Sequence, residues 1–307
     1  MSSLEVKNAG LHDLIAPDAP IERIAGGFKF TEGPVWRDNT LLFSDIPNNR
    51  VVRWRNLAEG PELTTFATGR SNGLTLDHQG NVLAAGHGGR DVARIAGGGT
   101  RSVRTVLADK FEGKPLNSPN DIVVKSDGAI YFTDPPYAVR IATPGMARPD
   151  GWWAAPIPGK EQACNGVYRL TAGGAPQLLI DDIALPNGLA FSPDESILSI
   201  DDSARNHIRV FDVRADGGLT NSRILMEMDS SDPGVPDGLK VDLQGNVFCT
   251  GPGGVWVCRA DGTLLGRIIL PELPANLAWG EDGSVLFFTA RTSVYRLQTK
   301  TRGVILG

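Results

Sequence analysis

A short motif occurs six times along the chain, and it restricts the possible folds more than any other feature of the sequence. Each copy begins with a polar residue and continues into an apolar-rich strand, a turn and a second strand that ends in small residues. The heading residues are Glu32, Asn72, Asn120, Asn187, Asp237 and Asn276. Four of the five intervals between them are about 40–50 residues long, the length of one four-stranded blade of a β-propeller.

The remaining strands of each repeat predict how the ring closes. A third strand follows in all six copies, but the last copy, which ends in TKTRGVILG, lacks a clear fourth strand. The segment IERIAGG, residues 21–27, supplies it, and this pairing would remove the sheet edges that an open array exposes. We predict an all-β, six-bladed β-propeller closed by this N-terminal strand, with one domain over residues 1–307. Residues 1–15 precede the closing strand and should be dispensable.

One repeat carries an insertion. The interval between Asn120 and Asn187 is longer than the others by roughly 20 residues. The excess falls at about 134–166, where frequent proline and glycine predict a loop and not a further pair of strands. The loop carries Tyr137, Trp152 and Trp153. It forms either a lid or wall of a binding site, or a surface flap packed by its own aromatic residues.

The six heading residues should converge, because the first strand of each blade lines the central channel of a propeller. All six side chains carry oxygen, and two carboxylates with several amide oxygens suit a hard cation such as Ca²⁺, Mg²⁺ or Mn²⁺. Asn and Asp are also common turn residues, so a purely structural role is the alternative. Glu32 is a poor turn former, and six equivalent positions favour the metal site.

Composition excludes several classes of partner. The net charge is −5 and no long basic run occurs, which argues against nucleic-acid binding. No window reaches 18 consecutive apolar residues, and the first residues do not resemble a signal peptide, so we expect no membrane association. An odd count of three cysteines, without a CxxC pair, suits the reducing cytoplasm. We expect a monomer or a homodimer.

Several segments resemble the SMP-30/gluconolactonase/LRE family. The matching pieces are FTEGPVW at 30–36, LNSPNDIVVKSDGAIYFTDPPY at 116–137, PNGLAFSPD at 186–194, PDGLKVD at 236–242 and TGPGGVWV at 250–257. Together they resemble the bacterial gluconolactonase branch. The resemblance implies a six-bladed propeller that hydrolyses a sugar lactone, such as gluconolactone or another aldonolactone, to the aldonic acid.

The resemblance also implies roles for individual residues. The family's metal ligands fall on Glu32, Asn187 and Asp237, and its substrate-facing asparagine falls on Asn120. We assign Asn72, on the neighbouring blade, to the substrate as well. Some animal members carry an arginine that contacts sugar hydroxyls two residues before this asparagine, where this chain has Ser118.

These assignments lead to a mechanistic hypothesis. One divalent ion, with Ca²⁺ expected first and Mg²⁺, Mn²⁺, Zn²⁺ or Fe²⁺ as alternatives, would polarise the lactone carbonyl. Asp237 would act as general base toward the attacking water, and His87 is the next candidate. Three aspartates that follow second strands either orient these groups or cap turns: Asp45, Asp134 and Asp201.

Two other functions stay open at this stage. A phosphotriesterase could use the same metal site, since a fold does not dictate its function. A propeller that only binds a protein partner is the second alternative, although the chain shows no WD-type blade signature. A serine hydrolase is not expected, because no GxSxG elbow occurs, and no HExxH zinc motif occurs either.

Overall fold

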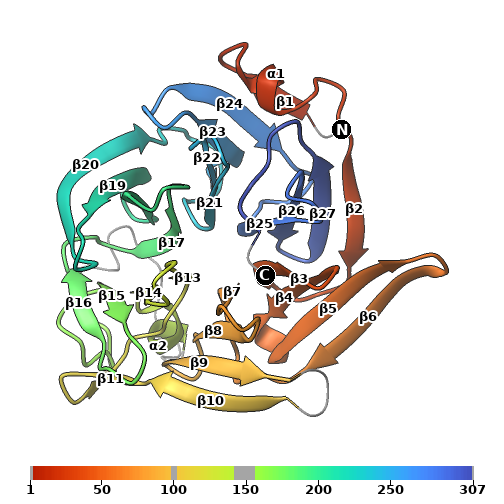
Figure 1. Ribbon diagram of the computed structural model, residues 1–307. Helices are drawn as coiled ribbons and strands as arrows, with labels where there is room; N and C mark the ends of the chain where they lie inside the picture. The colour runs from red at the N-terminus through yellow and green to blue at the C-terminus, as the bar shows by residue number, and fades with distance from the viewer. Residues whose placement is uncertain (1–2, 98–101, 142–155, 306–307) are drawn as a thin grey trace.

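Six antiparallel sheets surround a common axis in the computed structural model, which describes residues 3–97, 102–141 and 156–305 (Figure 1). The predicted six-bladed β-propeller is therefore confirmed. In each blade the first strand lies at the axis and later strands lie progressively farther out. From the axis outward, blades one to three consist of β3 (Thr31–Arg37), β4 (Thr40–Asp45), β5 (Arg50–Leu57) and β6 (Gly60–Phe66); β7 (Leu74–Leu76), β8 (Val82–Gly86), β9 (Asp91–Ala96) and β10 (Val103–Ala108); and β13 (Ile122–Val124), β14 (Ile130–Asp134), β15 (Gly166–Leu170) and β16 (Gln177–Ile180).

Blades four to six repeat the same order. They consist of β17 (Pro186–Phe191), β18 (Ile197–Asp202), β19 (His207–Val213) and β20 (Leu219–Glu227); β21 (Leu239–Val241), β22 (Val247–Gly251), β23 (Gly254–Cys258) and β24 (Leu264–Ile269); and β25 (Asn276–Gly280), β26 (Val285–Ala290), β27 (Ser293–Gln298) and β2 (Ile21–Gly26). Outside the blades lie a small hairpin and short helical turns: β11 (Lys110–Phe111) with β12 (Lys114–Pro115), the 3₁₀ turn η1 (Ile46–Asn48), α1 (Leu11–Leu14) and α2 (Tyr137–Ile141). Neither helix is long enough to cross a membrane.

The N-terminal strand closes the ring as predicted. Strand β2 pairs antiparallel with β27, from Ile21 opposite Leu297 to Gly26 opposite Ser293. Because β2 lies between α1 and the first blade in sequence but belongs to the last blade in space, the two ends of the repeat are joined by backbone hydrogen bonds.

The residues before β2 also have a packing role, which contradicts the expectation that they are dispensable. Strand β1 (Ser3–Val6) pairs with β24 and makes blade five a five-stranded sheet. Leu11, Leu14 and Ile15 are buried in the core between blades five and six. The backbone N–H of Lys300 donates to the Leu14 carbonyl at 2.7 Å.

Hydrophobic cores fill the spaces between neighbouring blades. Between blades six and one, for example, Trp36 stacks on Phe287 with ring centroids 5.2 Å apart, and Phe43 and Trp54 belong to the same cluster. Similar clusters lie at the other five blade interfaces. Because each blade packs only against its two neighbours, the inner strands are held at fixed positions around the axis.

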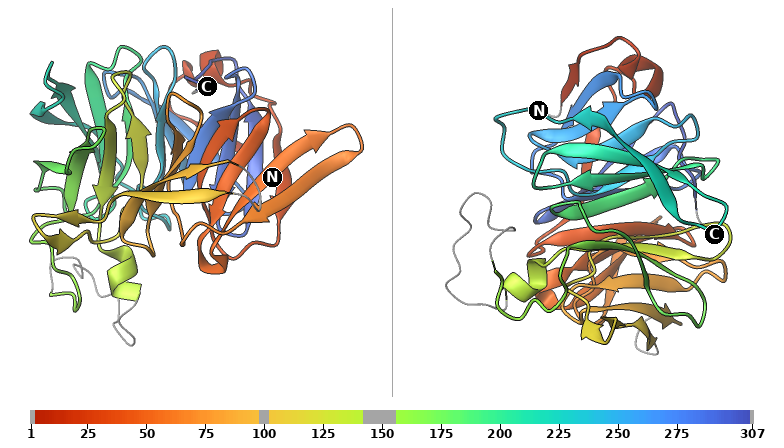
Figure 2. Two further views of the ribbon diagram at one scale, coloured as in Figure 1. Left: turned by 60° about the horizontal axis from the view of Figure 1, so that its bottom comes forward. Right: turned by 90° about the vertical axis from the view of Figure 1, so that its left-hand side faces the viewer.

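The two faces of the ring differ (Figure 2). Helix α2 lies on one face and the C-terminal residues lie on the opposite face. The insertion begins with α2, which the sequence did not predict, and its described part packs on the ring through Val139, Ile157 and Leu185. Trp152 and Trp153 lie outside the described residues. All three cysteines are free thiols, two of them buried.

Candidate metal and substrate site

The heading residues lie together at the axis, on the face that carries α2. Five of the six are buried, and Asp237 is half-buried. Glu32, Asn187 and Asn276 lie within the inner strands, whereas the others precede β7, β13 and β21 by two residues. The six blades therefore bring together oxygen-bearing side chains that are far apart in the sequence.

The strand register corrects the assignment of the sixth blade. The N–H of Asp237 donates to the Thr250 carbonyl, and in blade six the N–H that makes the equivalent bond to Thr289 belongs to Ala275. Ala275 is thus the heading residue of that blade. Asn276 takes the next position, which is occupied elsewhere by Gly33, Gly73, Asp121, Gly188 and Gly238.

The glycines of this second position allow neighbouring blades to approach closely. A methyl group on Gly33 would lie 2.1 Å from the Asn72 carbonyl oxygen, and one on Gly188 would lie 2.1 Å from the Asp237 carbonyl oxygen. Both distances are far shorter than a van der Waals contact. Asp121 and Asn276 are therefore the two side chains that this layer adds at the axis.

Small hydroxyl residues of the second strands hold the heading backbone in place. The hydroxyl of Ser44 donates to the Asn72 carbonyl at 2.7 Å, and that of Thr133 donates to the Asn187 carbonyl at 2.8 Å. Thr250 makes the corresponding bond to Ala275 at 3.0 Å. The small residues that end the second strands thus link each blade to the next.

Asn187 presents an unused oxygen to the site. Its amide nitrogen donates to the Ser203 hydroxyl at 3.0 Å, which orients the amide. Its Oδ1 atom is buried and has no hydrogen-bond partner among the described residues. An unpartnered buried carbonyl oxygen is costly, and a cation is one partner that would satisfy it.

Glu32 and Asp237 repel each other in the absence of a cation. Burial and the negative charge of Asp121 raise the pKa of Glu32 to about 7. Burial and the charges of Glu32, Asp201 and Asp121 raise the pKa of Asp237 well above its usual range. A divalent ion between such carboxylates would reverse this effect and favour their ionised forms.

Asn276 orients Glu32 and is not itself a free ligand. Its amide nitrogen donates to Glu32 Oε2 at 3.1 Å, while its oxygen accepts the Leu277 N–H at 2.8 Å. The same Oε2 accepts the Gly33 N–H at 2.7 Å. The other carboxylate oxygen of Glu32 has no hydrogen bond to a described residue and remains available.

The donor set as a whole fits a hard cation. The described residues contain no group of three or more His, Cys, Asp or Glu side chains placed to hold a metal ion. The site instead combines two carboxylates, Glu32 and Asp237, with the amide oxygen of Asn187, and such oxygen ligands suit Ca²⁺ or Mg²⁺.

Asn72 and Asn120 complete the ring on the neighbouring blades. Both are buried. The Oδ1 atom of Asn72 has no partner among the described residues, and no described residue bonds to the Asn120 side chain. Each amide can therefore donate to, and accept from, a bound molecule.

Comparison with known proteins identifies the family. The family model described as SMP-30/gluconolactonase/LRE-like region matches residues 30–292. The chain belongs to this family. The gluconolactonase of Zymomonas mobilis is 36% identical over 95% of this chain and 85% of its own length. The pentonolactonase of Haloferax volcanii is 24% identical over 81% of this chain and 77% of its own.

A solved structure agrees with this assignment. The gluconolactonase of Xanthomonas campestris superposes with a TM-score of 0.83 at 33% identity, and the match covers 97% of this chain and 95% of that one. The family resemblance predicted from the motifs is thus confirmed.

The Ser118 side chain forms hydrogen bonds within the protein. Its side chain is buried, its hydroxyl donates to the Pro135 carbonyl, and it accepts the Ala138 N–H at 3.1 Å. The hydroxyl therefore fixes the chain that leads into α2. It does not replace an arginine that would contact sugar hydroxyls.

The three aspartates after the second strands divide into two roles. Asp45 accepts hydrogen bonds from Asn48 and Arg50, and Asp134 accepts two backbone N–H groups at 2.7 Å, so both cap loops. Asp201 differs, because its Oδ1 atom is buried without a hydrogen-bond partner among the described residues and its charge raises the pKa of Asp237. Asp201 is therefore a close neighbour of Asp237 and not a loop cap.

His87 is a weak candidate for the general base. It is buried, and burial lowers its pKa to about 4, so the imidazole is neutral at pH 7. It is thus a weaker base than a free imidazole, and it stays the second candidate after Asp237.

Two charged residues of the site, Asp121 and Lys240, were missed from the sequence. Asp121 stands where four other blades have glycine, and Lys240 stands three residues after Asp237. Their Oδ2 and Nζ atoms are 3.8 Å apart. The only sequence signal was that each carries a charge inside an otherwise uncharged strand motif.

Proposed function

We propose that this protein hydrolyses a sugar lactone to the aldonic acid, using one divalent cation held by Glu32, Asn187 and Asp237. The observation that carries the proposal is the buried, unpartnered Oδ1 atom of Asn187 beside two carboxylates that burial and mutual repulsion destabilise. Two relatives named for lactone hydrolysis, a gluconolactonase and a pentonolactonase, support the substrate class.

The cation would supply Lewis acidity that stabilises the developing negative charge on the lactone carbonyl oxygen. Asn276 and the Gly33 N–H orient the Glu32 carboxylate, and Ser203 orients the Asn187 amide. These ligand side chains are thus held in place by the protein before anything binds.

Asp237 is the proposed general base. It is the half-buried member of the ring, so solvent can reach it, and its carboxylate can take a proton from the attacking water. A lactone is an activated ester, so a weak base is sufficient. The Asn120 and Asn72 amides would bind the lactone hydroxyls, because each amide can both donate and accept.

A pH-stat assay tests the proposal. Wild-type protein is stripped with EDTA, its metal content is checked by elemental analysis, and acid release is followed with gluconolactone and pentonolactones. We expect no enzymatic acid release without metal. Activity should return on addition of Ca²⁺, Mg²⁺, Mn²⁺, Zn²⁺ or Fe²⁺, tested singly.

A matched pair of variants locates the metal. Glu32→Gln should weaken cation binding at least as much as loss of an outer-shell partner does, about 10–100-fold. Glu59→Gln, on an exposed turn, should not change it. Full activity of metal-free protein would contradict the metal dependence, and preference for a paraoxon-like ester would favour the phosphotriesterase.

A further inference from the structure

A third layer of side chains lies below the site along the axis. Each blade contributes one inner-strand residue to this layer, at the equivalent position of the pairing between its first and second strands. Examples are Lys240, which pairs with Phe248, and Ala278, which pairs with Phe287. The layer consists of Val35, Thr75, Val123, Ala190, Lys240 and Ala278. Five of the six are uncharged, and the exception is Lys240.

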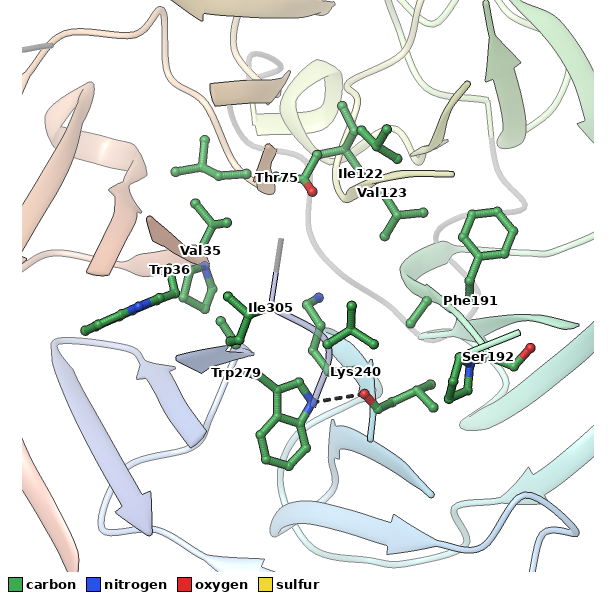
Figure 3. A pocket seen from close by; sticks show the side chains of 18 of the residues that line it. Val35, Trp36, Thr75, Ile122, Val123, Phe191, Ser192, Lys240, Trp279 and Ile305 are labelled. Atoms are coloured by element: carbon green, nitrogen blue, oxygen red, sulfur yellow. Dashed lines mark hydrogen bonds between the residues drawn. The ribbon is translucent and has the colours of Figure 1, made fainter. Parts of the chain in front are cut away.

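This layer borders an apolar cavity at the opposite end of the axis (Figure 3). The cavity is lined by all six residues of the layer and by larger apolar groups such as Trp36, Phe191 and Ile305. The Lys240 side chain is 22% exposed, so its ammonium group is only partly hydrated and a partner of opposite charge stabilises it.

The compensating partner of Lys240 lies on the polar side of the layer. Its Nζ atom is 3.8 Å from Asp121 Oδ2 and donates to its neighbour's carbonyl, that of Leu239, at 2.9 Å. The side chain of Asp121 is 2% exposed, and its Oδ2 has no hydrogen-bond partner among the described residues. Lys240 therefore places its charge beside the one carboxylate oxygen of Asp121 that the protein leaves unbonded.

Carboxylates accumulate at this level of the axis. The negative charges of Asp121 and Asp201 both act on Asp237, and that of Asp121 acts on Glu32. The positive charge of Lys240 acts on both Glu32 and Asp121 in the opposite sense. Asp121 is buried among these carboxyl groups and its Oδ2 atom has no hydrogen-bond partner among the described residues, so a positive charge beside that oxygen is electrostatically favourable.

We propose that the Lys240 ammonium occupies a second cation position in the channel, between Asp121 and the Leu239 carbonyl, and so limits the site to one divalent ion. The position has the ligands of a hard cation: a carboxylate oxygen and a backbone carbonyl oxygen. The inference rests on the proposed metal site for the identity of the first ion. It concerns only the number of ions that the channel accepts.

The test is the number of bound ions per chain, measured by calorimetric titration with Ca²⁺ and by elemental analysis after desalting. Lys240→Met keeps the length of the side chain and removes its charge, and it should bind one ion more than wild type. Lys240→Arg, which keeps the charge, should bind the wild-type number. Adding Asp121→Asn to Lys240→Met should abolish the extra ion.

Equal ion numbers in Lys240→Met and wild type would overturn the inference, as would an extra ion that survives Asp121→Asn. If Lys240→Met does not fold, Lys240→Gln provides the same comparison. The two proposals can fail separately. The proposed function depends on the number of ions bound by the wild type, whereas the inference about Lys240 depends on the difference in ion number between the variant and the wild type.

Discussion

The two ends of the central axis are built from the same six inner strands, yet they differ in chemistry. At the end that carries α2, the strands begin with oxygen-bearing side chains, and several hydrogen-bonding atoms are left without partners. At the other end the strands finish in apolar residues such as Trp36, Phe191 and Trp279, which border a cavity. The starts of the inner strands therefore form the candidate site, and their ends contribute to packing.

The C-terminal segment accounts for part of this difference. Thr301 donates to Asp242 Oδ2 at 2.7 Å, and Gly303 lies so close to Trp279 that an added methyl group would be 1.9 Å from the indole ring. Val304 and Ile305 then line the apolar cavity. The C-terminal residues thus fill part of the apolar end of the axis.

The largest expected effect comes from opening the ring, which would destroy both ends together. Deletion of residues 1–28 removes β2, β1 and the buried Leu11, and leaves β27 with an unpaired edge. The product should aggregate or lack a cooperative thermal transition. A soluble truncated protein with the wild-type Tm would disprove the closure.

The point variant Leu11→Ala should cause a smaller loss of stability than the deletion. A buried leucine replaced by alanine costs about 2–5 kcal/mol, so its Tm should lie between those of wild type and the truncated protein. It should also show whether the core between blades five and six, and not only β2, depends on the N-terminal residues.

At the polar end, Asp237→Asn should separate activity from stability. Loss of a general base costs about 10²–10⁴-fold in kcat, and the loss of a ligand adds to this. The metal-free variant should be no less stable than wild type, because one of several repelling carboxylates is gone. Steady-state kinetics at saturating metal, with Tm by calorimetry, measure both. A near wild-type kcat would move the base to another residue, with His87 tested next.

At the apolar end, Gly303→Ala should show the reverse pattern. Overpacking against Trp279 should lower the free energy of unfolding by about 1–3 kcal/mol, measured by urea denaturation. The kcat of the folded fraction should stay at the wild-type value. Gly218→Ala is the matched control, since its added methyl group would meet mainly the end of the exposed Asp216 side chain. A fall in kcat without a loss of stability would contradict the division between the two ends.

The smallest effect should come from Asn120→Ala, which keeps the ligands and removes one amide. A neutral hydrogen bond contributes about 0.5–1.5 kcal/mol, so KM should rise by about 2–13-fold. A decrease in kcat as well would show that the contact strengthens in the transition state. An unchanged KM with unchanged kcat would remove Asn120 from the substrate site.

Much of the architecture was predictable because each repeat carries its own local signals. Heading residues, glycine turns and strand lengths recur within about 40–50 residues, so the blade count and the missing strand near residues 21–27 follow from periodicity. The convergence of Glu32, Asn187 and Asp237 follows from the symmetry of the ring. The role of β1 and α1 was not predictable, because they resemble no repeat and their packing on blades five and six depends on the three-dimensional path of the chain.

The details of the site depend on relations between blades, which no single stretch of sequence contains. Asn276 resembles a heading residue in sequence, but hydrogen bonding to Thr289 assigns that place to Ala275. Residue types and their order therefore account for the ring and its oxygen donors. Three-dimensional packing accounts for the orientation of Glu32, the free oxygen of Asn187 and the pairing of Asp121 with Lys240, because strand register and close approach across the axis arise only when all six blades meet.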